Sequence, residues 1–285
     1  MCAALALACT DALPEVSRVD KLRLLSVRLD PPEAAPGEMA LVAPLAVDPM
    51  QRPIAYAWTA CDPRLPLEDP ADCKDALGIA ILANGDGRAM FSPDELLATF
   101  RRRPGPAAPD REAAAALAGG GRVVLPLVVV VRAGNDTAVA VKRLVWSPGD
   151  GPRNHNPQLL YVVASRQPLD PQISRRVPAG LTVPVGVVQQ GIDFEFYDPD
   201  GPGPLASRAE RHHAHWFATG GSFLHDETVS GQTEDGPRSE ENEWTAPEQA
   251  GTVRLWVVVT DGRGGETWEE RPIEVVPRAP AVTGS

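Results

Sequence analysis

The sequence has no excess of positive charge and no long apolar run. Its 285 residues include 27 Lys and Arg against 38 Asp and Glu, which gives a formal net charge of −11. Nucleic-acid binding needs clustered Lys and Arg, so this balance argues against such a partner and against electrostatic docking on anionic lipid. No stretch approaches the roughly 18 apolar residues that a membrane-spanning helix requires. We therefore expect an acidic, solvated surface.

The motifs of the common catalytic sites are also missing. The chain contains no G-x-S-x-G elbow, no H-E-x-x-H, no P-loop and no G-x-G-x-x-G after an expected strand. Ser222 lies in GGSF, without the flanking residues of a nucleophile elbow. Carboxylates are abundant, so a pair for glycoside hydrolysis stays open, although no pair stands out. We predict that the protein is not an enzyme.

Only four cysteines are present, and two of them lie within the first nine residues. The other two, Cys61 and Cys73, flank the loop CDPRLPLEDPADC, which contains no His. Two cysteines cannot form a four-ligand zinc site, whereas a disulfide across this loop would stabilise the fold by about 3 kcal/mol on the chain-entropy model. Such a bond persists only in an oxidising compartment. We predict a Cys61–Cys73 disulfide and export, with two unpaired thiols as the alternative.

The N-terminal segment contains a candidate targeting signal. Residues 2–8 are small and apolar and end in Ala6-Leu7-Ala8-Cys9, which resembles the lipobox of bacterial lipoproteins. In that family the cysteine is lipidated and becomes the mature N-terminus. The apolar segment is far shorter than a signal-peptide core and no Lys or Arg precedes it, so a complete signal peptide is not visible. We predict lipidation at Cys9 and assign residues 1–19 to a signal remnant and tether; the alternative is that Cys9 is incidental.

A strand pattern centred on a tryptophan occurs twice in the chain. Around Trp58 and Trp216, an alternating segment is followed by a Pro-marked bend, a Val-rich strand, a polar turn and a last strand. Alternation places Trp216 on one face of its strand and His213, His215 and Phe217 on the other. The spacing differs between the two copies only in loops, as in a duplicated sandwich. This pattern predicts an all-β protein of two tandem β-sandwiches with Trp58 and Trp216 in their cores.

Turn residues and helix caps divide the chain further. The capping box at 92–95 predicts a helix over 93–100, and a Gly-Gly-Gly stop predicts a second helix over 110–118. Both would form an insertion in the first domain. The predicted strands span 21–30, 39–47, 54–60, 123–132, 138–146, 158–165, 181–188, 192–197, 212–219, 253–260 and 266–276. We predict a first domain over 20–147, a linker over 148–157, a second domain over 158–278 and a tail over 279–285.

The second domain resembles a known class of module. WFATGGSF at 216–223, W-T-A-P at 244–247 and the D-G-x-G-G turn at 261–265 are similar to bacterial immunoglobulin-like surface modules, which are related to PKD-like and cadherin-like sandwiches. The resemblance covers roughly residues 155–277, while the first domain matches more loosely and the PKD signature W-x-F-G-D-G is missing. It implies two immunoglobulin-like β-sandwiches, the first with a short helical insertion, of a mostly non-catalytic kind.

Two groups of polar residues are candidate metal sites. His213 and His215 share the outer face of a strand and can share a zinc ion if a neighbouring strand supplies a third ligand; an exposed polar face explains the same residues. Asp198 and Asp200 could present oxygens to calcium, although D-P-D-G-P-G is also a tight turn. We predict no cofactor, with calcium as the open alternative. The acidic run over 226–243 is expected to be a solvated loop.

These patterns together predict a non-catalytic lipoprotein of the bacterial cell envelope. We expect it to be anchored in the outer membrane through Cys9 alone, to face the periplasm or the cell surface, and to serve as a structural or binding module. Its expected partner is an envelope or surface protein or a glycan. The main alternative is a calcium- or carbohydrate-binding adhesin, and the weaker one is a carboxylate-dependent hydrolase. A specific function would lie where the two copies differ.

Overall fold

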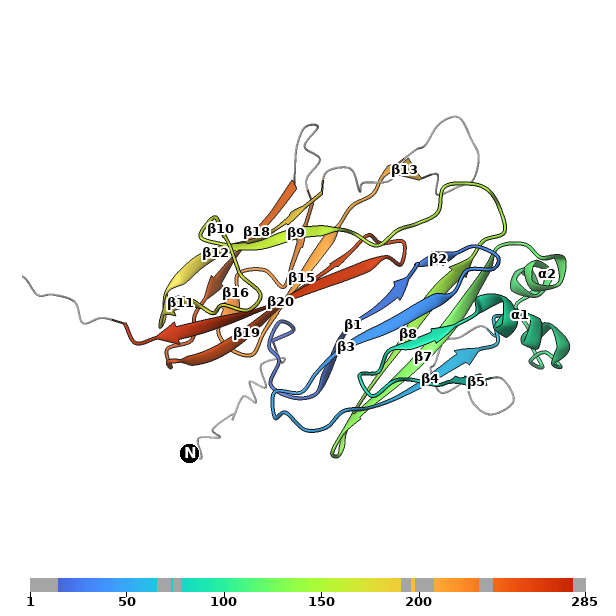
Figure 1. The fold of residues 1–285 in the computed structure, drawn as a ribbon, viewed down its shortest axis with the longest axis horizontal. Helices are drawn as coiled ribbons and strands as arrows, with labels where there is room; N and C mark the ends of the chain where they lie inside the picture. Colours follow the sequence, from blue (N-terminus) through green and yellow to red (C-terminus); the bar gives the residue numbers. More distant parts are fainter. Residues whose placement is uncertain are drawn as a thin grey trace, which may run out of the picture.

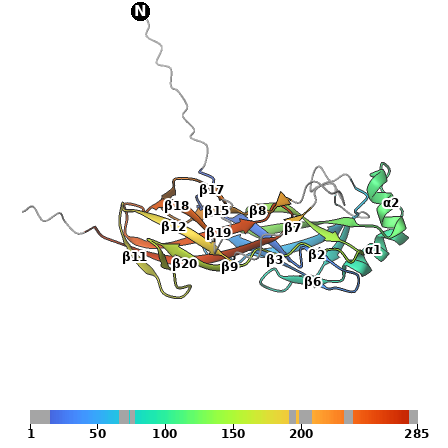
Figure 2. The same ribbon diagram turned by 90° about the horizontal axis from the view of Figure 1, so that it is seen from above.

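The computed structural model is an all-β structure of two immunoglobulin-like β-sandwiches with two short helices (Figure 1). It describes residues 15–65, 73, 78–190, 196–197, 208–230 and 238–278. The two sandwiches follow one another along the long axis of the molecule, and the helices cover the far end of the first one (Figure 2). The predicted fold class is confirmed, while the predicted domain bounds stay predictions.

The first sandwich packs a three-stranded and a five-stranded sheet over one core. Its strands are β1 Arg23–Asp30, β2 Glu33–Ala34, β3 Ala40–Val47, β4 Ala55–Cys61, β5 Gly78–Ile81, β6 Ala89–Phe91, β7 Val123–Ala133 and β8 Asp136–Trp146. The sheet orders are β1-β3-β6 and β2-β8-β7-β4-β5. Trp58 lies buried in the core, as predicted, and its indole N–H donates to the carbonyl of Gly87 at 2.7 Å. The predicted hairpin between β7 and β8 is also confirmed.

Two helices, α1 (Pro93–Arg102) and α2 (Arg111–Gly119), form the predicted insertion between β6 and β7. Each begins at a side chain that accepts a backbone hydrogen bond: Ser92 caps α1 and Asp110 caps α2. Gly120 ends α2 in the left-handed conformation with φ 71°. Among the residues that the structure describes, no helix is both long and apolar enough to cross a membrane.

The second sandwich packs two five-stranded sheets. Its strands are β9 Leu159–Ala164, β10 Gln167–Pro168, β11 Arg175–Pro178, β12 Thr182–Gln189, β15 His213–Ala218, β16 Ser222–Phe223, β17 Glu227–Val229, β18 Arg238–Thr245, β19 Gly251–Thr260 and β20 Glu266–Val276. The sheet orders are β10-β9-β12-β18-β16 and β11-β20-β19-β15-β17, and a separate pair joins β13 (Phe196–Tyr197) to β14 (Arg208–Ala209). Trp216 is fully buried in this core, as predicted, and donates to Thr228 Oγ1 at 3.0 Å.

The acidic run over 226–243 is not simply a loop, which corrects the sequence-based expectation. It contains β17 and most of β18, and β18 pairs with β12 along its whole length. Asn242 and Trp244 on β18 are buried, whereas the alternating residues Glu241 and Glu243 are exposed. The glutamates therefore occupy the solvent side of an alternating strand, which explains how an acidic segment can belong to a sheet.

Residues 15–19, which the sequence assigns to the tether, pack against the second sandwich. Arg18 forms a parallel bridge with Ala218 at the end of β15, and the N–H of Val19 donates to the Ala218 carbonyl at 2.9 Å. Ser17 and Val19 are buried. The chain thus contacts the second sandwich before it enters β1 of the first.

Candidate binding site between the two sandwiches

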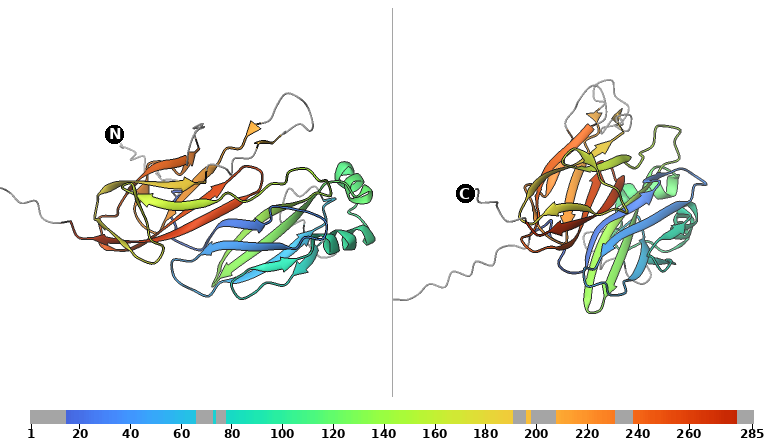
Figure 3. Two further views of the ribbon diagram at one scale, coloured as in Figure 1. Left: turned by 45° about the horizontal axis from the view of Figure 1, so that its top comes forward. Right: turned by 60° about the vertical axis from the view of Figure 1, so that its left-hand side comes forward.

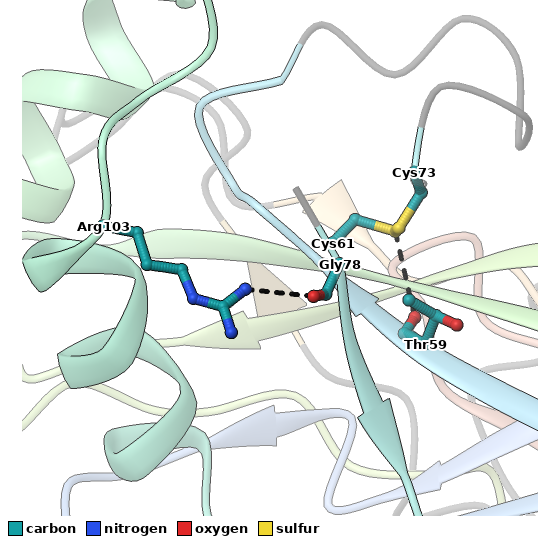
Figure 4. Close-up of a disulfide and its surroundings, with 5 residues drawn as sticks. All are labelled: Thr59, Cys61, Cys73, Gly78 and Arg103. Carbon is teal, nitrogen blue, oxygen red and sulfur yellow. Dashed lines mark hydrogen bonds between the residues drawn. A yellow bond between two sulfur atoms is a disulfide. The ribbon is translucent and has the colours of Figure 1, made fainter. Parts of the chain in front are cut away.

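The predicted disulfide is present and closes the loop after β4. Cys61 and Cys73 are bonded with their Cα atoms 5.4 Å apart, and both are buried (Figure 4). Arg103, directly after α1, donates through Nη1 to the carbonyl of Gly78 at the start of β5, at 3.0 Å. Arg64 in the disulfide loop donates through Nη2 to the carbonyl of Phe100 in α1 at 2.9 Å, so the loop, β5 and the helical insertion are joined at one end of the first sandwich.

Three of the predicted site residues lie outside the described residues. These are Cys9, the expected lipidation site, and Asp198 and Asp200, the expected calcium ligands. Within the part of the chain that the structure describes, no group of three or more His, Cys, Asp and Glu side chains is placed to hold a metal ion. The roles of these three residues stay predictions.

His213 and His215 lie on the outer face of β15, as the alternation predicts. Glu227 on the neighbouring strand β17 accepts a hydrogen bond from His213 Nδ1 at 2.5 Å, and its second carboxylate oxygen lies 3.6 Å from His215 Nδ1. The bond with His213 holds the pKa of Glu227 below its ordinary value. All three side chains are at least one-third exposed. They form a carboxylate–imidazole cluster at the sheet edge, and metal binding there stays a prediction.

The outer face of the same sheet continues into a buried contact with the first sandwich, which we call the seam. Its second-sandwich side contains Phe217, Trp256 and Val258, all of them buried. They pack against partly buried apolar side chains of the first sandwich, Leu25, Leu45 and Val47, and against Val19. Figure 3 shows β1 lying beside β20 at this contact. The seam therefore has its own small apolar core.

One carboxylate anchors the polar part of the seam. Glu266 at the start of β20 accepts hydrogen bonds from the Ser26 hydroxyl and from the N–H of Val27, at 3.1 Å, on β1. It also forms an ion pair with Lys142 on β8. The Lys142 and Glu266 side chains are only 9% and 19% exposed. A single side chain of the second sandwich thus binds both sheets of the first.

The predicted linker is also held in place by side chains. The N–H of Asn154 donates to Glu33 Oε2 at 3.1 Å in the first sandwich, and its amide donates to Asp261 Oδ2 at 2.8 Å in the second. Asn156 donates to the carbonyl of Leu29 and accepts from the N–H of Glu266. Each asparagine therefore connects the two sandwiches, so that the linker is part of the contact.

A buried acidic cluster lies beside this linker. Burial raises the pKa of Asp261, and the nearby charge of Glu210 adds to the effect. Glu210 itself pairs with Arg263 at 2.6 Å. A carboxyl with a raised pKa can mark a general acid, but Asp261 and Glu210 are only 4% and 3% exposed. Their burial favours a structural role.

The seam opens at one margin into a hollow of about 210 Å³, which we call the Trp268 pocket. It is lined by Arg28 and Asp30 of β1, Leu41 and Ala43 of β3, Arg88 before β6, and Trp268 of β20. In the β1–β3 ladder Arg28 lies opposite Ala43 and Asp30 opposite Leu41. These four residues form a continuous floor from the first sandwich, and Trp268 supplies a wall from the second.

A larger hollow of about 400 Å³ lies between α2 and β7. Both signs of charge line it, with Asp110 and Glu112 from the helix side and Arg122 and Arg143 from the strands. Its remaining lining residues are aliphatic or proline, so it offers no aromatic face to a ligand. The Trp268 pocket combines more kinds of recognition chemistry in a smaller volume.

Sequence reasoning did not identify Trp268, Lys142 or the two linker asparagines. A local signal exists for Trp268 alone, because Glu266, Trp268 and Glu270 alternate on the outer face of β20. A tryptophan between two outward glutamates stands on a face that a single free sandwich would expose to water. That signal indicates a ligand or a partner surface, and the structure places the first sandwich and a pocket at this face.

No family model and no curated protein matches the chain. Among solved structures it is similar to Bacteroides ovatus SGBP-B of a mixed-linkage glucan utilization locus, in complex with a mixed-linkage heptasaccharide, at 12% identity and TM-score 0.23, covering 90% of this chain and 48% of that one. It is also similar to the N-terminal Ig1-2 module of the Drosophila receptor protein tyrosine phosphatase DLAR, at 13% identity and TM-score 0.26, covering 91% of this chain and 100% of that one. A third similar structure is the Yersinia pseudotuberculosis adhesin InvE, at 9% identity and TM-score 0.24, covering 88% of this chain and 58% of that one. The chain spans about half the length of the first of these, and likeness at this level concerns the fold alone.

Proposed function

We propose that this protein is a non-catalytic structural or binding module of the bacterial cell envelope, built as one stiff unit of two sandwiches. The observation that carries this proposal is the seam. Contacts between domains of one chain are usually polar and leave the domains free to move. This one instead buries Phe217, Trp256 and Val258 and contains the largely buried Lys142–Glu266 ion pair.

The proposal requires that the two sandwiches keep a fixed relative orientation, unlike two domains joined by a flexible linker. The asparagines of the linker bond to both sandwiches, and residues 15–19 contact the second sandwich from the opposite end of the chain. Two segments therefore connect the sandwiches besides the seam itself. A ligand pocket made from both sandwiches keeps its shape only when they hold a fixed orientation.

The envelope location is proposed on two grounds. The Cys61–Cys73 disulfide supports an oxidising compartment, because such bonds persist there and are rare in the reducing cytosol. The segment ending at Cys9 resembles a lipobox. We therefore propose an outer-membrane lipoprotein that faces the periplasm or the cell surface, with an envelope protein or a glycan as its partner.

Nuclear magnetic relaxation of backbone amides tests the stiff unit. We expect one rotational correlation time for the amides of both sandwiches. The variant Val258→Asp, which places a charge in the apolar part of the seam, should separate the two values. Two distinct correlation times in the wild-type protein would contradict the proposal.

Mass spectrometry tests the anchor independently. The protein purified from bacterial membranes after expression of its full-length gene should carry diacylglyceryl and acyl groups on Cys9, and Cys9→Ser should lack them and leave the membrane fraction. An unlipidated wild-type Cys9 would remove the lipoprotein part of the proposal and leave the stiff two-sandwich module.

The calcium- or carbohydrate-binding adhesin remains the second candidate. A calcium-dependent rise in melting temperature that is lost in Asp198→Asn/Asp200→Asn would support calcium at the predicted loop. The carbohydrate form has a specific observation in its favour, because the Trp268 pocket joins an aromatic face to both hydrogen-bond donors and acceptors.

A further inference from the structure

We propose that the Trp268 pocket binds one ring of a neutral saccharide at the junction of the two sandwiches. This inference deepens the proposed binding function and rests on it, because the pocket exists only while both sandwiches hold their relative position. The first sandwich supplies the floor and the second supplies the wall.

Trp268 differs from the other five tryptophans in what its indole does. Those five are at most 7% exposed, and each donates its indole N–H to a protein oxygen: the acceptors belong to Gly87 for Trp58, Asp94 for Trp146, Thr228 for Trp216, Gly220 for Trp244 and Glu270 for Trp256. Trp268 is half-buried, and its N–H donates to no group in the described part of the chain. Buried and half-buried tryptophans usually find an acceptor. Trp268 lines the pocket, so a ligand bound there can supply an oxygen that accepts from this N–H.

The floor of the pocket has an apolar strip with polar groups beside it. Leu41 and Ala43 lie on the same face of β3, and Arg28 and Asp30 lie directly across from them on β1. A saccharide ring has C–H groups that pack on an apolar or aromatic surface, and hydroxyls that both donate and accept. Asp30 can accept from one hydroxyl while Arg28 donates to its neighbour. A purely apolar ligand would remove water from these two polar groups without replacing the hydrogen bonds that the water makes, at a cost in affinity.

The charges of the pocket favour a neutral ligand over an anion. Arg28 is paired with Asp30 at 3.1 Å, and Arg88 at the pocket margin is paired with Asp86 at 3.4 Å. Each guanidinium charge is thus matched by a carboxylate within two residues. A guanidinium has five N–H donors, so Arg28 retains donors for hydroxyls although its charge is compensated. An anionic ligand would meet the Asp30 carboxylate in the lining, and the two guanidinium groups that could attract it are already paired.

The volume limits how much of a ligand the pocket encloses. Sites for drug-sized ligands occupy about 300–1,000 Å³, and the Trp268 pocket has about 210 Å³. It therefore accommodates one ring of a chain, with adjoining rings running out along the seam. Recognition of a single ring implies modest affinity for a free monosaccharide and tighter binding when several copies of the protein meet one polymer.

Titration of the full chain with defined oligosaccharides tests the proposal. The neutral probes are hexamers of α- and β-linked glucose, xylose, mannose and N-acetylglucosamine, and the anionic probe is hexagalacturonate. The indole N–H cross-peak of Trp268, assigned by its loss in Trp268→Phe, should move with at least one neutral hexamer. In calorimetry Trp268→Ala should weaken that hexamer about tenfold or more, as expected for an aromatic anchor, and Asp30→Asn should weaken it less.

Tyr161→Ala is the matched control, because Tyr161 is an exposed aromatic residue of β9 outside the pocket. It should leave the affinity unchanged. The proposal is overturned if no neutral hexamer moves the Trp268 cross-peak, if only hexagalacturonate moves it, or if Tyr161→Ala weakens binding as much as Trp268→Ala. A single correlation time for both sandwiches together with any of these results would retain the stiff module and remove the saccharide site.

Discussion

Asp261 is a buried carboxylate that accepts hydrogen bonds from three donor groups. Its Oδ1 accepts from the N–H of Arg263 at 2.6 Å and of Gly265 at 2.9 Å, and its Oδ2 accepts from the amide of Asn154 at 2.8 Å. These bonds favour the charged form, yet burial, assisted by the charge of Glu210, raises the pKa above the ordinary value of 3.8. The folded protein therefore holds this proton more tightly than the unfolded chain does.

The variant Asp261→Asn should remove a defined part of the pH dependence of stability. Since the folded-state pKa is raised, the stabilisation from protonated Asp261 is complete below about pH 4 and is lost as the pH rises through the folded-state pKa. In the variant, the new amide can donate to Asn154 Oδ1, a buried atom without a partner among the described residues, once the Asn154 amide turns over. We expect a stability within about 1 kcal/mol of wild type at pH 7 and a flatter profile between pH 4 and 7.

Urea unfolding at several pH values measures this profile. Asp150→Asn, a substitution at an exposed position of the linker, controls for the loss of one negative charge. A profile for Asp261→Asn as steep as that of the wild type would show that the carboxyl does not titrate differently in the two states.

Residues with a local signature were predictable from the sequence, whereas those defined by the seam were not. Cys61 and Cys73 lie twelve positions apart around a turn-rich loop, and Trp58 and Trp216 sit at the centre of alternating strands. Their roles follow from neighbours in sequence. Trp268 acquires its role from residues about 240 positions earlier, on β1, and the sequence contains no pattern that links them.

At the scale of elements, the turn between β15 and β16 depends on Gly221. Its φ is +79°, a conformation that L side chains rarely adopt, and a Cβ placed there would collide with the carbonyl oxygen of Thr245 and the indole of Trp244. Gly37, in the turn before β3, has the same φ of +79° but no atom within 4 Å of such a Cβ. The two glycines therefore share the backbone strain and differ only in the packing around them.

We expect Gly37→Ala to cost about 1–2 kcal/mol, the penalty of the left-handed conformation. Gly221→Ala should cost a further 1–3 kcal/mol, roughly the range for forcing an extra methyl group into a filled site. Equilibrium unfolding in urea gives both free energies. Equal losses in the two variants would mean that Trp244 and Thr245 move aside without cost.

Elements with strong local patterns were predicted well, and one with a misleading composition was not. Capping side chains and a glycine stop located α1 and α2 to within a few residues, because these signals are intrinsic to helix ends. The strand β18 was missed since its outward glutamates dominate the composition of the segment. Its inward Asn242 and Trp244 contact the core only because β12 lies alongside.

At the scale of the whole molecule, the seam explains why two similar sandwiches behave as one. Its residues occupy outward positions of their strands, as Phe217 does on β15 and Glu266 does on β20. Alternation assigns such positions to solvent, and only the second sheet stacked against them makes them interior. Apart from the outward Trp268, nothing local to either sandwich indicates where the other will pack, and Trp268 alone does not identify its partner, so this level of structure could not be predicted from the sequence.

The Lys142–Glu266 ion pair provides a direct measure of that coupling. Glu266→Met leaves the Lys142 ammonium in the seam without its carboxylate and should destabilise the protein by about 3–5 kcal/mol. Lys142→Met/Glu266→Met removes both charges and should recover part of the lost stability. The recovery is incomplete because Ser26 and Val27 still lack their acceptor.

The exposed Arg176–Glu274 ion pair between β11 and β20 is the matched control. Its side chains are 71% and 48% exposed, and its double-mutant cycle should give a coupling energy of about 1 kcal/mol or less. Calorimetric unfolding of the wild type, Lys142→Met, Glu266→Met and the double variant gives the coupling energy of the seam pair. Each variant should shift a single transition that reports both sandwiches, since the pair lies between them. A coupling energy no larger than that of the control pair would mean that the seam holds the sandwiches through its apolar core alone.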